Sequence, residues 1–273
     1  MEKANIVGIV LVQNEEYYIH RVLTNIRHFC DEIIVADNQS IDNTAEQVQL
    51  FIEEHPDTPI HYHNISHPRE SHTLIEHLAG TNTWVFAVDG DEIYDPIGLA
   101  VLKQQILEGV FNDWWVLFGN VLHCVEVNVE DRYARGYLAP PCRSMTKLYN
   151  FSAIRSWRGP CPERLHGGER EFKPGYDKSL RNELYKENVW EDSIFRCLHL
   201  CFLERSSLDM RRHGALYSRK NISDKNLQTP LGKIVELLMT FIGKKRISSW
   251  KQQKYMRGNI VNKNVEVFFS TTS

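Results

Sequence analysis

Residues 84–92 of this chain read WVFAVDGDE, and this stretch does most to decide the fold. Its first five residues are apolar, β-branched or aromatic, which predicts a buried strand over 84–88. Two carboxylates, Asp89 and Asp91, follow where that strand ends. Paired carboxylate oxygens are hard ligands of the kind that Mg²⁺ and Mn²⁺ prefer. The stretch therefore predicts a sheet with a divalent-cation site at its edge.

The residues upstream alternate between strand and helix patterns. Apolar runs over 6–12, 32–36 and 60–63 predict three more strands, and helical patterns separate them. This alternation predicts an α/β fold with a mostly parallel sheet flanked by helices. Acidic residues come directly after the strands. Because open α/β sheets bind ligands at the carboxyl ends of their strands, we expect the site at that edge.

The second half of the chain has a weaker pattern. It predicts a helix beginning at Pro96, a strand over 113–125, a hairpin over 143–157, loops over 158–190 and a strand over 193–203. From Ser206 the pattern becomes helical and more basic. We therefore expect one domain over 1–205, divided near residue 110, and a helical C-terminal extension over 206–273.

The composition narrows the class of protein. The chain has 273 residues and a formal net charge of −3, which argues against nucleic acid as a partner. It shows neither an apolar run of membrane-spanning length nor a signal peptide, so we expect a cytoplasmic protein. An apolar stripe over 231–250 leaves two interpretations open: packing on the parent domain, or peripheral contact with the inner face of a membrane. The oligomeric state is left undetermined.

The six cysteines lack the spacing of a disulfide framework, so we expect them to be reduced. Cys197, His199 and Cys201 form a short alternating pattern. It has no second CxxC pair to complete it, which argues against a zinc site.

Three motifs each follow a predicted strand. In chain order they are Asn14-Glu15, the stretch DNQSIDNT over 37–44, and the Asp89–Asp91 pair. Together they resemble family 2 glycosyltransferases with the GT-A fold, nearest to the lipopolysaccharide-type members. The resemblance covers residues 5–110 well and continues weakly to residue 205. It implies a nucleotide-sugar-binding half over 1–110 and an acceptor and catalytic half over 111–205. It also implies Mn²⁺ or Mg²⁺ as cofactor and a nucleotide-diphosphate sugar as donor, with a UDP-sugar favoured.

The resemblance assigns roles at the donor site. The nucleotide would be contacted by Gln13, Glu15 and Asp37. Asp89 would contact the ribose or a metal-bound water, and it is also a candidate metal ligand. Arg69 matches a basic position in the family, and a phosphate contact and a solvated surface position are equally open for it. Within the 37–44 motif, Gln39 replaces a more usual glycine, and Asp42 is read as a helix cap.

The metal and the catalytic base are assigned in the same way. Asp91 would coordinate the metal, and His199 resembles the late histidine that completes such sites, with a satisfied core histidine as the alternative. For an inverting reaction, Glu163 would be the general base and Asp192 the competing candidate. A loop salt bridge is the alternative for Glu163, and a turn or helix cap is the alternative for Asp192.

The resemblance thus implies a hexosyltransferase-type enzyme of glycan or polysaccharide biosynthesis. Its acceptor would be a glycan, a lipid-linked molecule or another hydroxyl compound. Two other functions remain as alternatives. A nucleotidyltransferase also uses nucleotides and Mg²⁺, but a glycine-rich phosphate loop is expected after its first strand. A non-catalytic GT-A-like domain would only bind a sugar or a partner, and the intact Asp89 and Asp91 argue against it.

Overall fold

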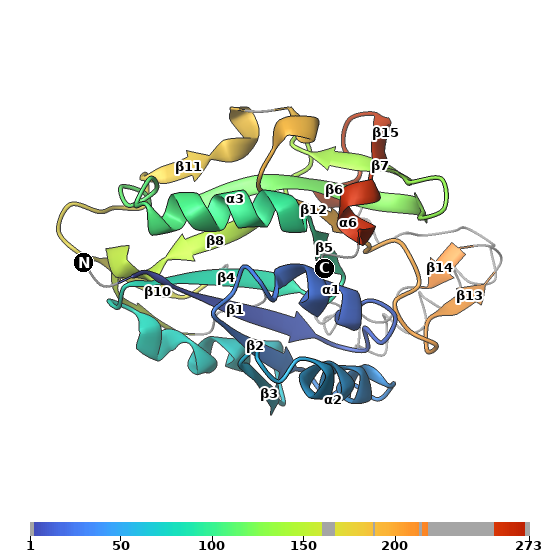
Figure 1. Cartoon of the computed structure of the whole chain (residues 1–273), viewed down its shortest axis with the longest axis horizontal. Coiled ribbons are helices and arrows are strands. Elements are labelled where there is room, and N and C mark those ends of the chain that lie inside the picture. Colours follow the sequence, from blue (N-terminus) through green and yellow to red (C-terminus); the bar gives the residue numbers. More distant parts are fainter. Residues whose placement is uncertain (1–2, 160–166, 188, 213–214, 218–253, 271–273) are drawn as a thin grey trace, which may run out of the picture.

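The computed structural model describes residues 3–159, 167–187, 189–212, 215–217 and 254–270. An eleven-stranded sheet forms its centre, and helices cover it (Figure 1). The four strands predicted in the first half are confirmed. They are β1 (Asn5–Val12), β2 (Glu32–Asp37), β3 (Ile60–Asn64) and β4 (Thr83–Asp89). They lie in the order β4-β1-β2-β3, and each pairing is parallel.

The other seven strands extend this sheet beyond β4. They are β5 (Glu92–Tyr94), β6 (Val116–Asn128), β7 (Tyr133–Ala139), β8 (Thr146–Asn150), β11 (Arg181–Glu183), β12 (Arg196–His199) and β15 (Ile260–Asn264). From the strand pairings, β5, β7 and β8 run against the other eight of the eleven described strands. The predicted α/β fold with a mostly parallel sheet is therefore confirmed.

Side chains alternate across the sheet, so each face carries its own core. One face packs against α1 (Ile19–Ile26), α2 (Thr44–Glu54), α3 (Pro96–Leu107) and the short α6 (Glu266–Phe269). The other face packs against three 3₁₀ segments, η1 (Pro68–Leu74), η2 (Glu76–Leu78) and η3 (Phe151–Ala153), and against strand β9 (Ile154–Arg158). The sheet is thus the middle of three layers.

The start of α3 follows from local sequence chemistry. The Asp95 carboxylate accepts hydrogen bonds from the backbone N–H groups of Ile97 and Gly98, each at 3.0 Å. Pro96 occupies the first turn, where its missing N–H costs nothing. The predicted helix beginning at Pro96 is confirmed.

The predicted hairpin over 143–157 is wrong. β8 pairs with β4 and β6, whereas β9 pairs with β10 (Glu169–Phe172) in a separate two-stranded sheet. The connection between β8 and β9 is one turn of 3₁₀ helix, and Asn150 fixes it by accepting a 3.0 Å hydrogen bond from the Ser152 N–H. That turn leads the chain away from β8, so the two strands separate although they are adjacent in sequence.

The helical pattern expected between the strands over 60–63 and 84–88, and the loops expected over 158–190, contain further short elements. The first consists of η1 and η2, which are 3₁₀ and not α-helical. The second contains β10, β11, η4 (Leu184–Lys186) and the first residue of η5 (Trp190–Asp192). Short exposed strands like β10 carry little periodic signal, which is why the sequence pattern missed them.

The C-terminal residues rejoin the main sheet. β13 (Met210–Arg212) and β14 (Ala215–Tyr217) pair with each other, and β15 pairs with β7. The predicted apolar stripe over 231–250 lies outside the described residues, as does most of the predicted helical extension. Among the described residues, every helix is too short or too polar to cross a bilayer.

Candidate metal centre at the carboxyl edge of the sheet

The ends of β1, β2 and β4 bring the predicted acidic residues to one edge. In the strand register Val12 is opposite Asp37, and Leu11 is opposite Asp89. The backbone N–H of Gly90 donates a 3.0 Å hydrogen bond to the carbonyl oxygen of Leu11. The turns after β1 and β4 therefore lie in contact.

Gly90 is required by this close approach. A Cβ atom at this position would lie 2.8 Å from Cγ of Glu15 and 2.8 Å from Cγ1 of Val12. The missing side chain lets the Glu15 side chain lie against the turn between the two aspartates. The DGD pattern therefore combines two carboxylates with the small residue that brings a third carboxylate next to them.

Asp89, Asp91 and His199 form a candidate metal centre. Their ligand atoms all lie within 4.8 Å of one another. Asp91 and His199 are each 3 % exposed, and Nε2 of His199 lies 3.5 Å from Oδ1 of Asp91. Adjacent ligands of an octahedral Mg²⁺ site lie roughly 3 Å apart, so a small closure would suffice for a shared ion. Two hard oxygen donors and one imidazole fit Mn²⁺ or Mg²⁺.

The fold holds His199 against this turn. His199 is the last residue of β12, and the next backbone N–H, that of Leu200, donates a 2.9 Å hydrogen bond to the carbonyl oxygen of Asp91. Glu92, fully buried, accepts hydrogen bonds from the Asp89 N–H at 3.3 Å and from the Tyr94 hydroxyl at 2.9 Å. Glu92 therefore supports the turn that carries the two aspartates.

Arg205 is a member of the site that the sequence analysis missed. Its Nη1 lies 2.9 Å from Oε1 of Glu15 and 3.2 Å from Oδ2 of Asp91. Burial opposes the charge on Arg205, but Glu15 and Asp91 outweigh that effect and raise its pKa. Nothing near residue 205 in the sequence indicates a partner 190 residues away.

The site is strongly negative around this cation. Burial, together with the nearby carboxylates of Asp91 and Glu15, raises the pKa of the Tyr18 hydroxyl to about 12. A phenol resists losing its proton beside carboxylates because both would then carry negative charge. Such a field attracts a divalent cation.

Asp37 is fully buried and supports the turn after β2. Its Oδ1 accepts a 2.7 Å hydrogen bond from the Ser40 N–H, and its Oδ2 accepts one of 2.7 Å from the Tyr62 hydroxyl. Gln39 has a φ of 57°, in the left-handed region that favours glycine. The same turn receives a bond from Gln13, whose Nε2 donates to the carbonyl oxygen of Asn38 at 2.9 Å.

The helix-cap interpretation of Asp42 agrees with its contacts. Its Oδ1 accepts a 3.0 Å hydrogen bond from the backbone N–H of Thr44, the first residue of α2. Thr44 in turn accepts a 2.7 Å bond from the Glu15 N–H through its Oγ1. The 37–44 motif thus holds the turn that carries Glu15.

The remaining predicted residues lie elsewhere. Arg69 is exposed at the start of η1. Asp192 is exposed in η5, beside Glu191, which pairs with Lys263 at 2.7 Å. Glu163 lies outside the described residues. The roles assigned to these three residues, like those of the donor and metal residues, stay predictions.

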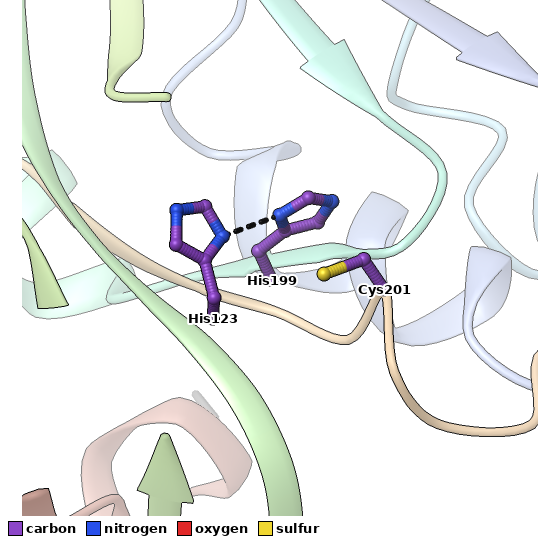
Figure 2. A group of neighbouring side chains, drawn as sticks. All are labelled: His123, His199 and Cys201. Carbon is purple, nitrogen blue, oxygen red and sulfur yellow. Dashed lines mark hydrogen bonds between the residues drawn. The ribbon is translucent and has the colours of Figure 1, made fainter. Parts of the chain in front are cut away.

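A second group of donor atoms lies next to the first. His123 on β6 is the register partner of His199, and their Nδ1 atoms are 2.8 Å apart (Figure 2). Cys201 joins them, so His199 belongs to both groups. His123 was not predicted, because one histidine within a long apolar strand carries no signal of its own.

No protein-family model and no curated protein matches this chain. Solved structures do match. One is the mannosyltransferase PcManGT from Pyrobaculum calidifontis in complex with GDP-Man and Mn²⁺, with a TM-score of 0.33 and 24% identity over 46% of this chain and 37% of that chain. Another is TarS from S. aureus, with a TM-score of 0.41 and 14% identity over 72% of this chain and 60% of that chain.

A third match is glucosyl-3-phosphoglycerate synthase from Mycobacterium tuberculosis in complex with Mn²⁺, UDP-glucose and glycerol 3-phosphate. Its TM-score is 0.36, with 18% identity over 55% of this chain and 58% of that chain. The chain thus spans less than two thirds of the length of each of these proteins. All three TM-scores lie below 0.5.

Proposed function

We propose that this protein is a metal-dependent glycosyltransferase of the GT-A fold and of family 2. It would transfer a sugar from a nucleotide-diphosphate sugar to an acceptor hydroxyl. One observation carries the proposal: the donor atoms of Asp89, Asp91 and His199 converge at the carboxyl edge of the sheet, beside Glu15. The order of the motifs around Glu15, Asp37 and Asp91, which resembles that family, supports the same function.

Different residues at this edge would bind different parts of the donor. Asp89, Asp91 and His199 would hold Mn²⁺ or Mg²⁺, which when bound offsets the charge that builds on a leaving diphosphate. Gln13, Glu15 and Asp37 would contact the nucleotide. The Asp37 carboxylate accepts the Tyr62 hydroxyl through Oδ2 and keeps further lone pairs that can accept a bond from the base or ribose. Arg69 would contact phosphate, and a UDP-sugar is the favoured donor.

An acceptor hydroxyl must lose its proton as it attacks the sugar, and a carboxylate suits that task. We assign this role to Glu163 first and to Asp192 second, for an inverting reaction. A lost general base lowers turnover by about 10²–10⁴-fold. Glu163→Gln should therefore bind the donor normally and release almost no UDP, while Asp192→Asn, the matched change, should retain most activity. The reverse order would move the base to Asp192, and equal mild effects would reject the inverting assignment.

A non-catalytic nucleotide-sugar- or partner-binding domain is the second candidate. Arg205 favours it, because its guanidinium already neutralises Asp91 and Glu15 without a metal ion. Such a domain would bind its ligand equally well with and without a divalent cation. An active enzyme would gain affinity from the ion.

A thermal-shift panel separates these candidates. The full chain is melted with UDP-, GDP- and other nucleotide sugars, each with Mn²⁺ and with a chelator. A ligand at 100 times its Kd stabilises the native state by about 2.7 kcal/mol, which raises the melting temperature by several degrees. We expect such a shift for one nucleotide class and only with Mn²⁺. Shifts that are independent of Mn²⁺, or no shift for any nucleotide sugar, would contradict the proposal.

A further inference from the structure

The pairing of β6 with β12 brings together three metal-binding side chains that are far apart in sequence. His123 and His199 are register partners on these neighbouring strands, and Cys201 follows just after β12. The ligand atoms of the three residues lie within 4.8 Å of one another. All three side chains are buried and turn toward a common point, as Figure 2 shows.

The donor set differs in kind from that of the aspartates. Two imidazole nitrogens and one thiolate are borderline to soft ligands, whereas Asp89 and Asp91 offer hard oxygens. Zn²⁺ is commonly bound by such nitrogen and sulfur donors, and three protein ligands leave a fourth position open. We propose that His123, His199 and Cys201 form a binding site for a thiophilic divalent metal ion, with Zn²⁺ as the occupant.

The observed geometry needs only a small adjustment to hold such an ion. The two Nδ1 atoms are 2.8 Å apart and share a hydrogen bond. With Zn–N distances of about 2.0–2.1 Å and tetrahedral angles, the nitrogens would be roughly 3.4 Å apart. The rings would thus separate by about half an ångström. On binding, the Cys201 thiol gives its proton to solvent. The ring that carries a proton on Nδ1 changes tautomer and carries it on Nε2, so that both Nδ1 atoms present a lone pair.

Tyr255 closes the site on another side. Its ring contacts both imidazoles, with centroid distances of 4.7 Å to His123 and 5.2 Å to His199. Tyr255 is only 7 % exposed, so a bound ion would be shielded from bulk water there. In the sequence, the short pattern over 197–201 lacked a second CxxC pair, and that lack argued against a zinc site. The fold supplies the missing donor from His123, 76 residues away from His199.

The shared histidine makes the two metal groups compete. A neutral imidazole has one lone pair, so His199 can serve either group but not both. Its Nε2 faces Asp91 at 3.5 Å, while its Nδ1 faces His123. Zinc at the new site would therefore remove His199 from the Asp89–Asp91 group. This consequence rests on the proposed function: Zn²⁺ would weaken Mn²⁺-dependent nucleotide binding.

Cobalt titration of the reduced full-length protein, without nucleotide, tests the site directly. Co²⁺ replaces Zn²⁺ in such sites, and a cobalt–thiolate bond gives a charge-transfer absorption in the near ultraviolet. We expect one equivalent of Co²⁺ to produce this band and Zn²⁺ to abolish it. Cys201→Ser should lose the band and weaken cobalt binding by at least about tenfold. Cys197→Ser is the matched control, a buried cysteine on β12 that lies outside the donor group, and should keep both.

A wild-type protein without the band would overturn the proposal, and this result does not depend on how any variant folds. A band that persists in Cys201→Ser would overturn it as well. Asp91→Asn separates the site from the proposed function, because it leaves all three soft donors in place. A cobalt band in this variant supports the zinc site whatever the outcome of the UDP measurements. If Mn²⁺-dependent UDP binding is absent in both the wild type and the variant, only the proposed function is rejected.

Discussion

The guanidinium of Arg205 lies between the carboxylates of Glu15 and Asp91. The motif resemblance assigns nucleotide binding to Glu15 and metal binding to Asp91. Its side chain is 16 % exposed, and those of Glu15 and Asp91 are 6 % and 4 % exposed. Two buried carboxylates held this close would repel each other without a cation. Arg205 therefore stabilises the edge of the sheet when no metal ion is bound there.

Removing this charge should destabilise the fold. Breaking a buried ion pair by deleting one partner typically costs about 3–5 kcal/mol, because a charge is left uncompensated. Arg205→Gln should lower the free energy of unfolding in urea by about that amount, and saturating Mn²⁺ should restore part of it. Arg132→Gln is the control, since Arg132 pairs with Glu266 at the surface, where such pairs contribute less than about 1 kcal/mol. Equal losses in the two variants would refute this role of Arg205.

A second prediction at this scale concerns Asp37. If its carboxylate reads the nucleotide base, Asp37→Ala should weaken UDP binding by about 1–3 kcal/mol, measured by calorimetry. Tyr62→Phe removes the hydroxyl bonded to Oδ2 but leaves the carboxylate, so it should change the UDP affinity by less than about 0.5 kcal/mol. If the wild type bound UDP, GDP and CDP equally, Asp37 would not be reading the base.

Elements whose periodicity is strong were predictable from the sequence, and elements defined by distant partners were not. The strands β1 to β4 and helix α3 carry their own signals: apolar runs for the strands, and a proline at the first helical position of α3. Nothing in the sequence of β8 indicates that this strand lies between β4 and β6. For the same reason the sequence located Asp89, Asp91 and His199 but missed Arg205 and His123. Their relevance depends on contacts formed only when β12 lies beside β6 and residues 204–206 lie against the turn after β1.

Glu16 links residues 206 and 207 to the turn before α2. Its Oε1 accepts a hydrogen bond from the Ser206 hydroxyl at 3.2 Å, and its Oε2 accepts one from the Asn43 N–H at 3.1 Å. Burial acts to raise the pKa of Glu16, but these bonds and those from Ser207 outweigh it and lower the pKa to about 2. The charged form of Glu16 is therefore the one that the fold favours.

This shift fixes the sign of a pH effect. Because the folded pKa lies below the ordinary value of 4.5, the contribution of Glu16 is complete above pH 4.5 and is lost as the pH falls toward about 2. Glu16→Gln should lower the free energy of unfolding near pH 6 and make it decline less between about pH 4.5 and about pH 3. Urea unfolding across this range is the measurement. Glu130→Gln, an exposed control, should leave the curve unchanged, and a Glu16→Gln curve parallel to the wild type would contradict the assignment.

At the scale of the whole molecule, the fold directs the ends of β1, β2, β4 and β12 to one region. The parallel strands supply carboxylates, and β12, which leads back beside β6, supplies the imidazole. A divalent ion held there would face a nucleotide bound across the first half of the sheet. Nucleotide binding should therefore depend on a metal ion held by Asp91.

Calorimetry of UDP binding with and without Mn²⁺ measures this dependence. The full-length wild type should bind UDP more tightly with Mn²⁺ than with a chelator. Asp91→Asn should lose this difference while it keeps a native circular-dichroism spectrum, and Asp57→Asn, which removes the same charge from an exposed position, should keep the difference. A Mn²⁺-dependent UDP affinity that is unchanged in a folded Asp91→Asn protein would contradict the metal assignment and the function built on it.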